Sequence, residues 1–168
     1  MPEKTIILNN KQILQKMDRM AYQIYENYYN ENELVIAGIA PDGEVLAKKI
    51  IEKLEAISNI KVAYANILLH KNNPLSGSVN LSIDNSQFEN KHIIIVDDVL
   101  NSGLTMMYAI NKFLETSVKS IKTLVLVDRS HKRFPIKVDF VGLSLSTTMQ
   151  EHVQVSLEEG NYSAYLID

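Results

Sequence analysis

The acidic pair Asp97 and Asp98, with the short polar loop after it, is the part of this sequence best suited to chemistry. An apolar run at 93–96 precedes the pair and predicts a buried strand, and apolar residues at helical spacing follow over 106–114. Backbone N–H groups at a helix start have no intrahelical partner, and the helix dipole adds partial positive charge there. The order strand, acidic pair, loop and helix therefore predicts an anion site, best filled by a phosphate.

The loop offers the groups that a phosphate needs. Gly103 lets the backbone approach a ligand closely, and Ser102 and Thr105 add hydroxyl donors. The expected phosphate-binding residues are Asn101, Ser102, Gly103, Leu104 and Thr105. Asp97 and Asp98 would repel a phosphate, but they can accept hydrogen bonds from sugar hydroxyls or help hold a hydrated Mg²⁺. A phosphorylated sugar fits both halves of such a site, whereas the alternative is an ordinary solvated turn.

The same layout of strand, loop and helix recurs along the chain and predicts the fold. Apolar runs at 34–39, 93–96 and 121–127 are typical of strands buried on both faces. Helical periodicity lies between them, so we expect an α/β fold with a doubly wound, mainly parallel sheet flanked by helices. Such sheets bind ligands at the carboxyl ends of their strands. The loops expected to share one site are therefore 40–43, 97–105 and 128–135.

Periodicity also predicts the remaining elements. An amphipathic helix is expected over 13–28, capped by Asn9 or Asn10, with its apolar stripe packed in the core. A short apolar lead-in at 5–8 precedes this helix, and a second helix is expected over 45–54. Further strands are expected at 60–69, 79–83, 138–143, 153–157 and 165–167. With no repeat or linker, the chain is expected to form one domain over residues 1–168.

Composition excludes several classes of protein. The 168 residues suit one domain with a sizeable core, and the absence of Cys rules out disulfides and thiolate zinc sites. The N-terminus lacks the pattern of a signal peptide, and no apolar run approaches the ~20 residues of a membrane span. We therefore expect a cytoplasmic protein without a membrane partner. The net charge of −3 argues against bulk nucleic-acid binding but leaves room for a local basic patch.

The stretch from 92 to 105 resembles the phosphoribosyl diphosphate (PRPP) signature of type I phosphoribosyltransferases. In that family a buried strand ends in two acidic residues, and a Thr-Gly-any-Thr loop holds the 5′-phosphate. Here Ser102 keeps the hydroxyl of the first Thr, whereas Leu104 stands where many relatives carry Arg or Lys. The resemblance implies the type I phosphoribosyltransferase fold, with a small hood and a flexible β-hairpin loop, and makes Asp97 and Asp98 the catalytic pair.

Two further loops take their expected roles from the same resemblance. The pyrophosphate of PRPP would lie at Ala40, Pro41, Asp42 and Gly43. Asp42 stands where relatives often carry a basic residue, and a carboxylate repels pyrophosphate unless Mg²⁺ screens it. The polar stretch at 70–78 would be the flexible loop that closes over the substrate, with His70 and Lys71 as its cations.

The second half of the chain narrows the resemblance to the PyrR-type pyrimidine operon attenuators, which are also uracil phosphoribosyltransferases. The stretches at 127–136 and 138–142 carry it, and the N-terminal segment and the tail also align in order. By this resemblance, a hood formed by about 128–136 and the C-terminal segment covers the nucleobase. The expected hood residues are Asp128, Arg129, His131 and Pro135.

The resemblance implies an enzyme that uses PRPP and Mg²⁺ to convert a pyrimidine base, uracil, to UMP with release of pyrophosphate. Mg²⁺ would be held through PRPP and by Asp97 and Asp98, and a homodimer or higher homo-oligomer is expected. Leu104, Asp42 and the His70-Lys71 pair are less basic than in relatives, so weakened activity or a different substrate is also an expectation.

Two other functions compete with this one. The first is a nucleotide-sensing regulator that binds an mRNA leader, with weak or no catalysis. Its candidate phosphate contacts are Lys11, Lys16, Arg19, Arg129, Lys132, Arg133 and Lys137. The second is a receiver-like domain with an acidic Mg²⁺ pocket, but its acidic pair would follow the first strand and Thr105 would have no role.

Overall fold

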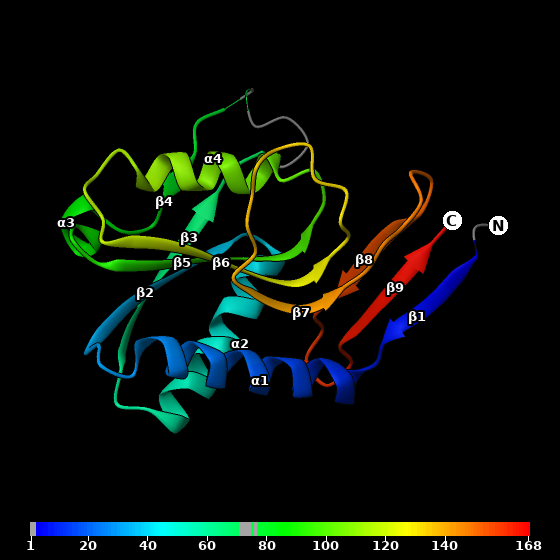
Figure 1. The fold of residues 1–168 in the computed structure, drawn as a ribbon, viewed down its shortest axis with the longest axis horizontal. Helices are drawn as coiled ribbons and strands as arrows, with labels where there is room; N and C mark the ends of the chain where they lie inside the picture. The colour runs from blue at the N-terminus through cyan, green and yellow to red at the C-terminus, as the bar shows by residue number, and fades with distance from the viewer. Residues whose placement is uncertain (1–2, 71–74, 76) are drawn as a thin grey trace.

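The computed structural model describes residues 3–70, 75 and 77–168, so Lys71 of the predicted flexible loop lies outside the described residues. Six strands form the central sheet in the order β4-β3-β2-β5-β6-β7, and three others form a second sheet in the order β1-β9-β8 (Figure 1). The elements are β1 (Lys4–Leu8), α1 (Asn10–Tyr28), β2 (Glu33–Ile39), α2 (Asp42–Ile57), β3 (Lys61–Leu68), β4 (Asn80–Leu81), α3 (Asn85–Phe88), β5 (His92–Leu100), α4 (Leu104–Phe113), β6 (Ser120–Asp128), β7 (Phe140–Ser144), β8 (His152–Ser156) and β9 (Ser163–Ile167).

The central sheet is parallel except for β4, which pairs antiparallel with β3. Successive side chains of a strand point to opposite faces, so β5 serves two cores. Ile94 and Val96 pack with α1 and α2 on one face, whereas Ile93 and Ile95 pack with α3 and α4 on the other (Figure 1). All four side chains are fully buried. The prediction of a doubly wound sheet flanked by helices is confirmed.

The first helix shows how local sequence sets an element boundary. The Asn9 side chain accepts the Gln12 N–H at 2.9 Å, and the Gln12 side chain accepts the Asn9 N–H at 2.9 Å. This capping box satisfies two N–H groups that the helix cannot, so α1 begins at Asn10. The buried stripe comprises Ile13, Met17, Met20, Ala21, Ile24 and Tyr28. The prediction of a core-packed stripe is confirmed for these six residues, whereas Tyr25, which was also expected in the stripe, is 38% exposed.

The strand predicted at 79–83 is wrong in extent, because only Asn80 and Leu81 pair with β3. The cause lies in the residues that follow. Asp84 and Gln87 form a second capping box, which turns the chain into the short helix α3. A four-residue helix thus replaces the end of the expected strand.

The second sheet joins the two ends of the chain. The strand β9 pairs antiparallel with β1 on one side and with β8 on the other. The apolar lead-in at 5–8 is therefore an edge strand of a sheet otherwise built from the tail. This sheet stands beside the carboxyl-end edge of the central sheet (Figure 1). Among the described helices, none combines the length and the hydropathy that a bilayer span requires.

Candidate active site

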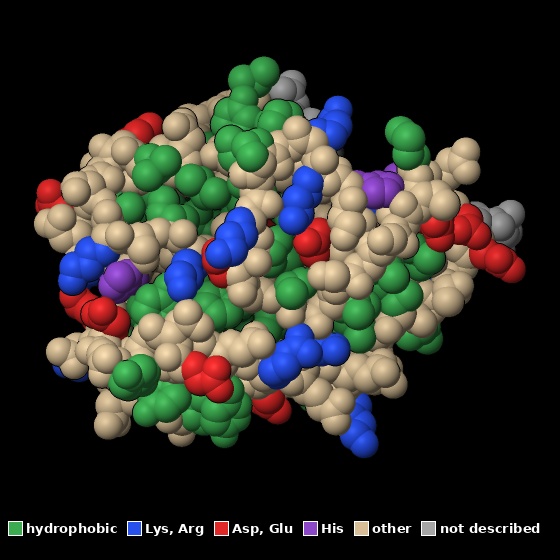
Figure 2. All heavy atoms as spheres, in the orientation of Figure 1, with side chains coloured by type: hydrophobic (Ala, Val, Ile, Leu, Met, Phe, Trp, Pro, Cys, Tyr) green, Lys and Arg blue, Asp and Glu red, His purple; other side chains and the backbone are tan. Residues whose placement is uncertain are grey.

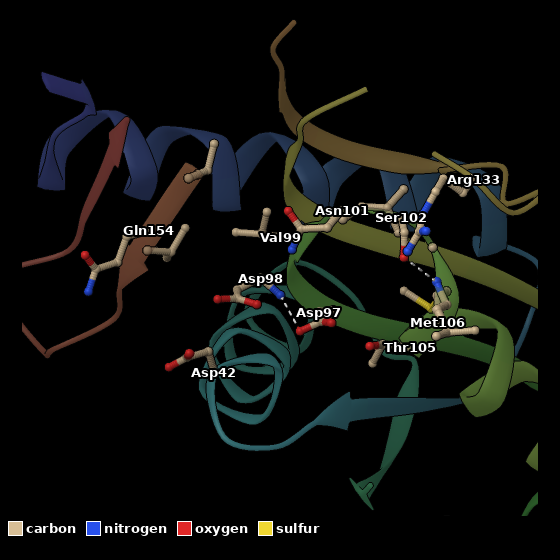
Figure 3. A pocket seen from close by; sticks show the side chains of 15 residues that line it. Asp42, Asp97, Asp98, Val99, Asn101, Ser102, Thr105, Met106, Arg133 and Gln154 are labelled. Carbon is tan, nitrogen blue, oxygen red and sulfur yellow. Dashed lines mark hydrogen bonds between the residues drawn. The ribbon is translucent and has the colours of Figure 1, made fainter. Parts of the chain in front are cut away.

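A cavity of about 550 Å³ lies at the carboxyl ends of the central strands and contains both halves of the predicted site (Figure 3). Its floor and one wall come from the end of β5, the loop after it and the first turn of α4, and β8 of the second sheet forms part of the facing wall. The lining residues are Asp42, Asp97, Asp98, Val99, Leu100, Asn101, Ser102, Gly103, Leu104, Thr105, Met106, Arg133, Val153, Gln154 and Val155.

The cavity opens where the sheet changes direction. From β2 the chain continues through α2 to β3 on one side, whereas from β5 it continues through α4 to β6 on the other. The crossover helices therefore diverge to opposite faces, and a crevice remains between the ends of β2 and β5. The pairing of β2 with β5 ends at Gly38 and Val96, so Asp97 and Asp98 lie just beyond the last residue pair that joins these two strands. The acidic pair is nevertheless inside β5, which continues to Leu100 beside β6.

A glycine brings the third carboxylate to the crevice. A Cβ atom at Gly43 would lie 2.5 Å from the carbonyl oxygen of Val96, closer than real Cβ contacts allow. Without a side chain there, the start of α2 lies directly against β5. Asp42, the first residue of α2, consequently lines the same cavity as Asp97 and Asp98. Of the predicted pyrophosphate loop, which also includes Ala40 and Pro41, only Asp42 lines this cavity.

Two of the three carboxylates lie deep in the cavity wall. The Asp97 and Asp98 side chains are nearly buried, at 4% and 9% exposure, and the Asp98 N–H donates to Asp97 Oδ1 at 2.9 Å. No three His, Cys, Asp or Glu side chains converge as a metal site within the described part of the chain. These acids can therefore supply only some of the oxygens around a Mg²⁺ ion. That fits an ion completed by water and by the phosphates of a ligand, as Mg²⁺ prefers.

The loop after β5 has the geometry of an anion site. Gly103 adopts φ = 92° at the N-cap of α4, a conformation that favours glycine. The Ser102 hydroxyl accepts the Leu104 N–H at 3.3 Å, and the side chains of Ser102 and Thr105 line the cavity (Figure 3). The hydroxyls and the first N–H groups of the ten-residue helix α4 thus lie together at one wall.

A segment from the next crossover fixes this loop in place. The Ser102 carbonyl accepts two backbone N–H groups, from Arg133 at 2.9 Å and from Phe134 at 3.1 Å. On the same side, a Cβ atom at Gly103 would lie 3.1 Å from Ile136 Cγ1. The loop is therefore held by backbone hydrogen bonds and by close packing, which keeps its donors in position before a ligand binds.

Comparison with known proteins identifies the family. The chain matches the family described as "Phosphoribosyl transferase domain" over residues 3–159. It is 35% identical to the bifunctional protein PyrR of Brevibacillus brevis, covering 95% of this chain and 93% of that protein. It is 32% identical to the bifunctional protein PyrR of Macrococcus caseolyticus, covering 94% of each. The chain belongs to the phosphoribosyl transferase family, and within it to the PyrR type.

Solved structures agree on the fold of this phosphoribosyl transferase. The hypoxanthine phosphoribosyltransferase of Trypanosoma cruzi superposes with a TM-score of 0.76 over 95% of each chain, at 19% identity. A hypoxanthine-guanine phosphoribosyltransferase of Bacillus anthracis gives a TM-score of 0.70 over 84% of this chain, at 21% identity. At such identities the likeness shows the fold alone, and it confirms the predicted type I phosphoribosyltransferase fold.

The predicted hood residues do not line the cavity. Asp128 accepts the Ser130 N–H at 2.9 Å and pairs with Lys132 at 3.5 Å, so its carboxylate serves its own turn. His131 Nε2 contacts the Thr147 carbonyl, and Pro135 is exposed beside the segment that fixes the Gly103 loop. The C-terminal segment, which was expected to share in the hood, does line the cavity through Val153, Gln154 and Val155 of β8.

Arg129 is a buried structural residue, which corrects its prediction as an RNA contact. It is 7% exposed, and its guanidinium donates to Asn101 Oδ1 at 3.2 Å and to Thr147 Oγ1 at 3.0 Å. It also donates to the carbonyls of Thr148 at 3.2 Å and Glu151 at 2.6 Å. These four hydrogen bonds and the burial leave little of the guanidinium available to an RNA phosphate. Arg129 thus ties the 147–151 segment, which leads into β8, to the loop at 101–105.

Sequence reasoning anticipated two parts of the site only incompletely. The C-terminal segment was expected to share in a hood, but the alternating pattern at 153–157 did not indicate which of its residues line the cavity. Arg133 was assigned to RNA, although it lies in the loop expected at the site and its charge was the available signal. His70 of the predicted flexible loop does not line the cavity.

Replacing Gly103 with Ala should destabilise the protein more than replacing Gly160 with Ala. Both glycines have positive φ, 92° and 81°, so each variant loses about 1–2 kcal/mol to the left-handed conformation. Only the Gly103 methyl meets a neighbour, Ile136, whereas Gly160 has nothing within 4 Å. Overpacking should cost a further ~1–3 kcal/mol. Urea unfolding measures both losses, and equal losses would contradict the packing argument.

Replacing Arg129 with Met should lower the free energy of unfolding by at least ~1–3 kcal/mol, because acceptors of the 147–151 segment lose their donor. Arg19→Met is the matched control. Arg19 also donates to two backbone carbonyls, those of Val141 at 2.8 Å and Gly142 at 2.9 Å, but it is exposed. Arg19→Met should lower the free energy of unfolding by ~0.5 kcal/mol or less. Chemical denaturation of both variants tests this, and similar losses would show that burial of Arg129 is unimportant.

Proposed function

We propose that this protein transfers the phosphoribosyl group of PRPP to a pyrimidine base, uracil, and releases pyrophosphate and UMP. The observation that carries the proposal is that the acidic pair and the hydroxyl-lined loop share one cavity at the switch point of a phosphoribosyl transferase fold. One wall suits a phosphate and the other suits sugar hydroxyls or a cation. PRPP presents both groups on one ribose.

The proposed roles follow the cavity walls. Asn101 to Thr105 form the cup for the 5′-phosphate, through hydroxyls and helix-start N–H groups. Asp97 and Asp98 accept hydrogen bonds from the ribose hydroxyls. The pyrophosphate lies toward the start of α2, at Ala40 to Gly43. When bound, Mg²⁺ neutralises the leaving pyrophosphate, and Asp97 and Asp98 with the oxygens of PRPP would hold it.

The chemistry is a displacement at C1 of the ribose. The bond from C1 to the pyrophosphate oxygen breaks and its electron pair leaves with the pyrophosphate, the bond from C1 to N1 of uracil forms, and the N1 proton of uracil passes to solvent. Positive charge develops on the ribose ring in the transition state, beside the acidic pair. The protein contributes fixed charge and orientation, so no covalent nucleophile is needed.

The proposal also covers the surroundings of the site. Residues 1–168 would form one phosphoribosyltransferase domain, with the sheet β1-β9-β8 as its hood and β8 as the wall beside the base. The loop at His70 and Lys71 would close over bound PRPP. The protein would act in the cytoplasm as a homodimer or higher homo-oligomer.

Purified protein should release pyrophosphate from PRPP and uracil only when Mg²⁺ is present. Asp97→Asn and Asp98→Asn should each lower kcat/KM about ten- to hundredfold, because a charge-assisted hydrogen bond is worth ~1.5–3 kcal/mol. Asp18→Asn, which removes a carboxylate on α1 that is 57% exposed, should retain the wild-type rate. A coupled pyrophosphate assay measures all four proteins. Absence of turnover with uracil and with every other common nucleobase would refute the enzyme proposal.

RNA-dependent regulation is a second candidate, favoured by the curated relatives, which are named bifunctional. Lys132, Arg133 and Lys137 are exposed in one segment, and Arg19 is exposed on α1. Lys and Arg side chains form a loose row across the face in Figure 2, with acidic side chains between them. An mRNA leader could contact such a row through its phosphates.

The RNA candidate predicts that a pyrimidine-operon leader binds with an affinity that falls with salt and responds to UMP. Lys137→Gln should weaken binding of all sequences and reduce the slope of log affinity against log salt by about 1. Lys119→Gln, an exposed cation at the opposite edge of the sheet, should leave the slope unchanged. Gel-shift titrations measure this. Equal affinity with and without UMP would count against a nucleotide-sensing regulator.

A further inference from the structure

The described residues that line the cavity carry more negative than positive charge. Asp42, Asp97 and Asp98 line it, and Arg133 is the single Lys or Arg among its described lining residues. Leu104, at the first position of α4, brings no charge to the phosphate loop. A sugar phosphate carries close to two negative charges at neutral pH, as phosphate esters do. Within the loop itself, only uncharged donors such as hydroxyls and backbone N–H groups are available to bind that charge.

We propose that Arg133 is the cation that binds the 5′-phosphate of PRPP, supplied from the 129–136 segment rather than from the phosphate loop itself. This inference rests on the proposed function and names a residue for it. Arginine suits the task because its planar guanidinium can donate two parallel hydrogen bonds to phosphate oxygens.

The backbone places Arg133 beside the loop. The N–H groups of Arg133 and Phe134 both donate to the Ser102 carbonyl, so the residue is attached to the loop that would hold the phosphate. Its side chain lies next to Ser102 in the close view of the cavity (Figure 3). Because these contacts use only the main chain of Arg133, its side chain can be changed without removing them.

The neighbouring cations are already engaged, which leaves Arg133 for the ligand. The Arg129 guanidinium donates to Asn101 and to the 147–151 segment, and Lys132 pairs with Asp128 at 3.5 Å. Arg133 is exposed, and within the described part of the chain its guanidinium has no ion-pair partner. Its charge is therefore not neutralised by another side chain before the phosphate arrives.

The test is the affinity of Arg133→Gln for two fragments of PRPP. Ribose 5-phosphate has the 5′-phosphate without the pyrophosphate, whereas Mg²⁺-pyrophosphate has the pyrophosphate without the ribose and its 5′-phosphate. Measured by calorimetry, Arg133→Gln should lower the affinity for ribose 5-phosphate and for PRPP about ten- to hundredfold, as expected for a lost charge-assisted hydrogen bond. Pyrophosphate binding should change less than twofold. Arg133→Lys should lose less affinity than Arg133→Gln, because lysine keeps the positive charge although it lacks the planar pair of donors. Lys119→Gln, which removes one charge far from the cavity, should bind like wild type.

Chemical labelling keeps the inference testable even if a variant does not fold. In the wild-type protein, ribose 5-phosphate should protect Arg133 from phenylglyoxal, as read by mass spectrometry, and should leave the exposed Arg19 reactive. The inference fails, and the proposed function stands, if the wild type binds both PRPP and ribose 5-phosphate and Arg133→Gln binds them with affinities within twofold of the wild type. The same conclusion follows if the wild type binds both compounds but ribose 5-phosphate does not protect Arg133. If the wild type binds neither compound, the proposed function itself fails.

Discussion

The parallel pairing of β2 with β5 is the constraint on which the site depends. The two strands lie side by side, yet their crossover helices pack on opposite faces of the sheet, so no connection covers the gap between their carboxyl ends. Glycine at position 43 then lets α2 start against the backbone of β5. The acidic pair and the start of α4 reach the cavity because the sheet reverses its winding here.

Charge is distributed unusually around this crevice. Three aspartates line it, and the loop that suits a phosphate has an apolar side chain at its first helical position. Backbone N–H groups and hydroxyls remain as donors, and the nearest lining cation comes from a different crossover. Among the described residues, the acidic side chains do not form a metal site by themselves.

Contacts between distant segments fix the position of the loop at 101–105 relative to the facing wall formed by β8. Buried Arg129 connects the loop at 101–105 to the segment before β8, and the Ser102 carbonyl accepts the N–H groups of Arg133 and Phe134. The second sheet in turn requires both ends of the chain, because β9 lies between β1 and β8. The cavity wall contributed by Val153 to Val155 is therefore supported by residues more than a hundred positions away in sequence.

The sequence by itself determined the elements with strong local signals: the buried strands, the amphipathic helix that starts after Asn9, and the order strand, acidic pair, loop, helix. These follow from hydrophobic periodicity and capping, which depend on neighbours a few residues apart. Only the tertiary structure decided that Arg129 is buried, that Arg133 lines the cavity, that β1 joins the tail and that β8 forms a wall. Those outcomes depend on packing and on strand pairing between distant segments. A charged or alternating stretch has the same local pattern whether it lies in a solvated loop, in a buried structural contact or in a cavity wall.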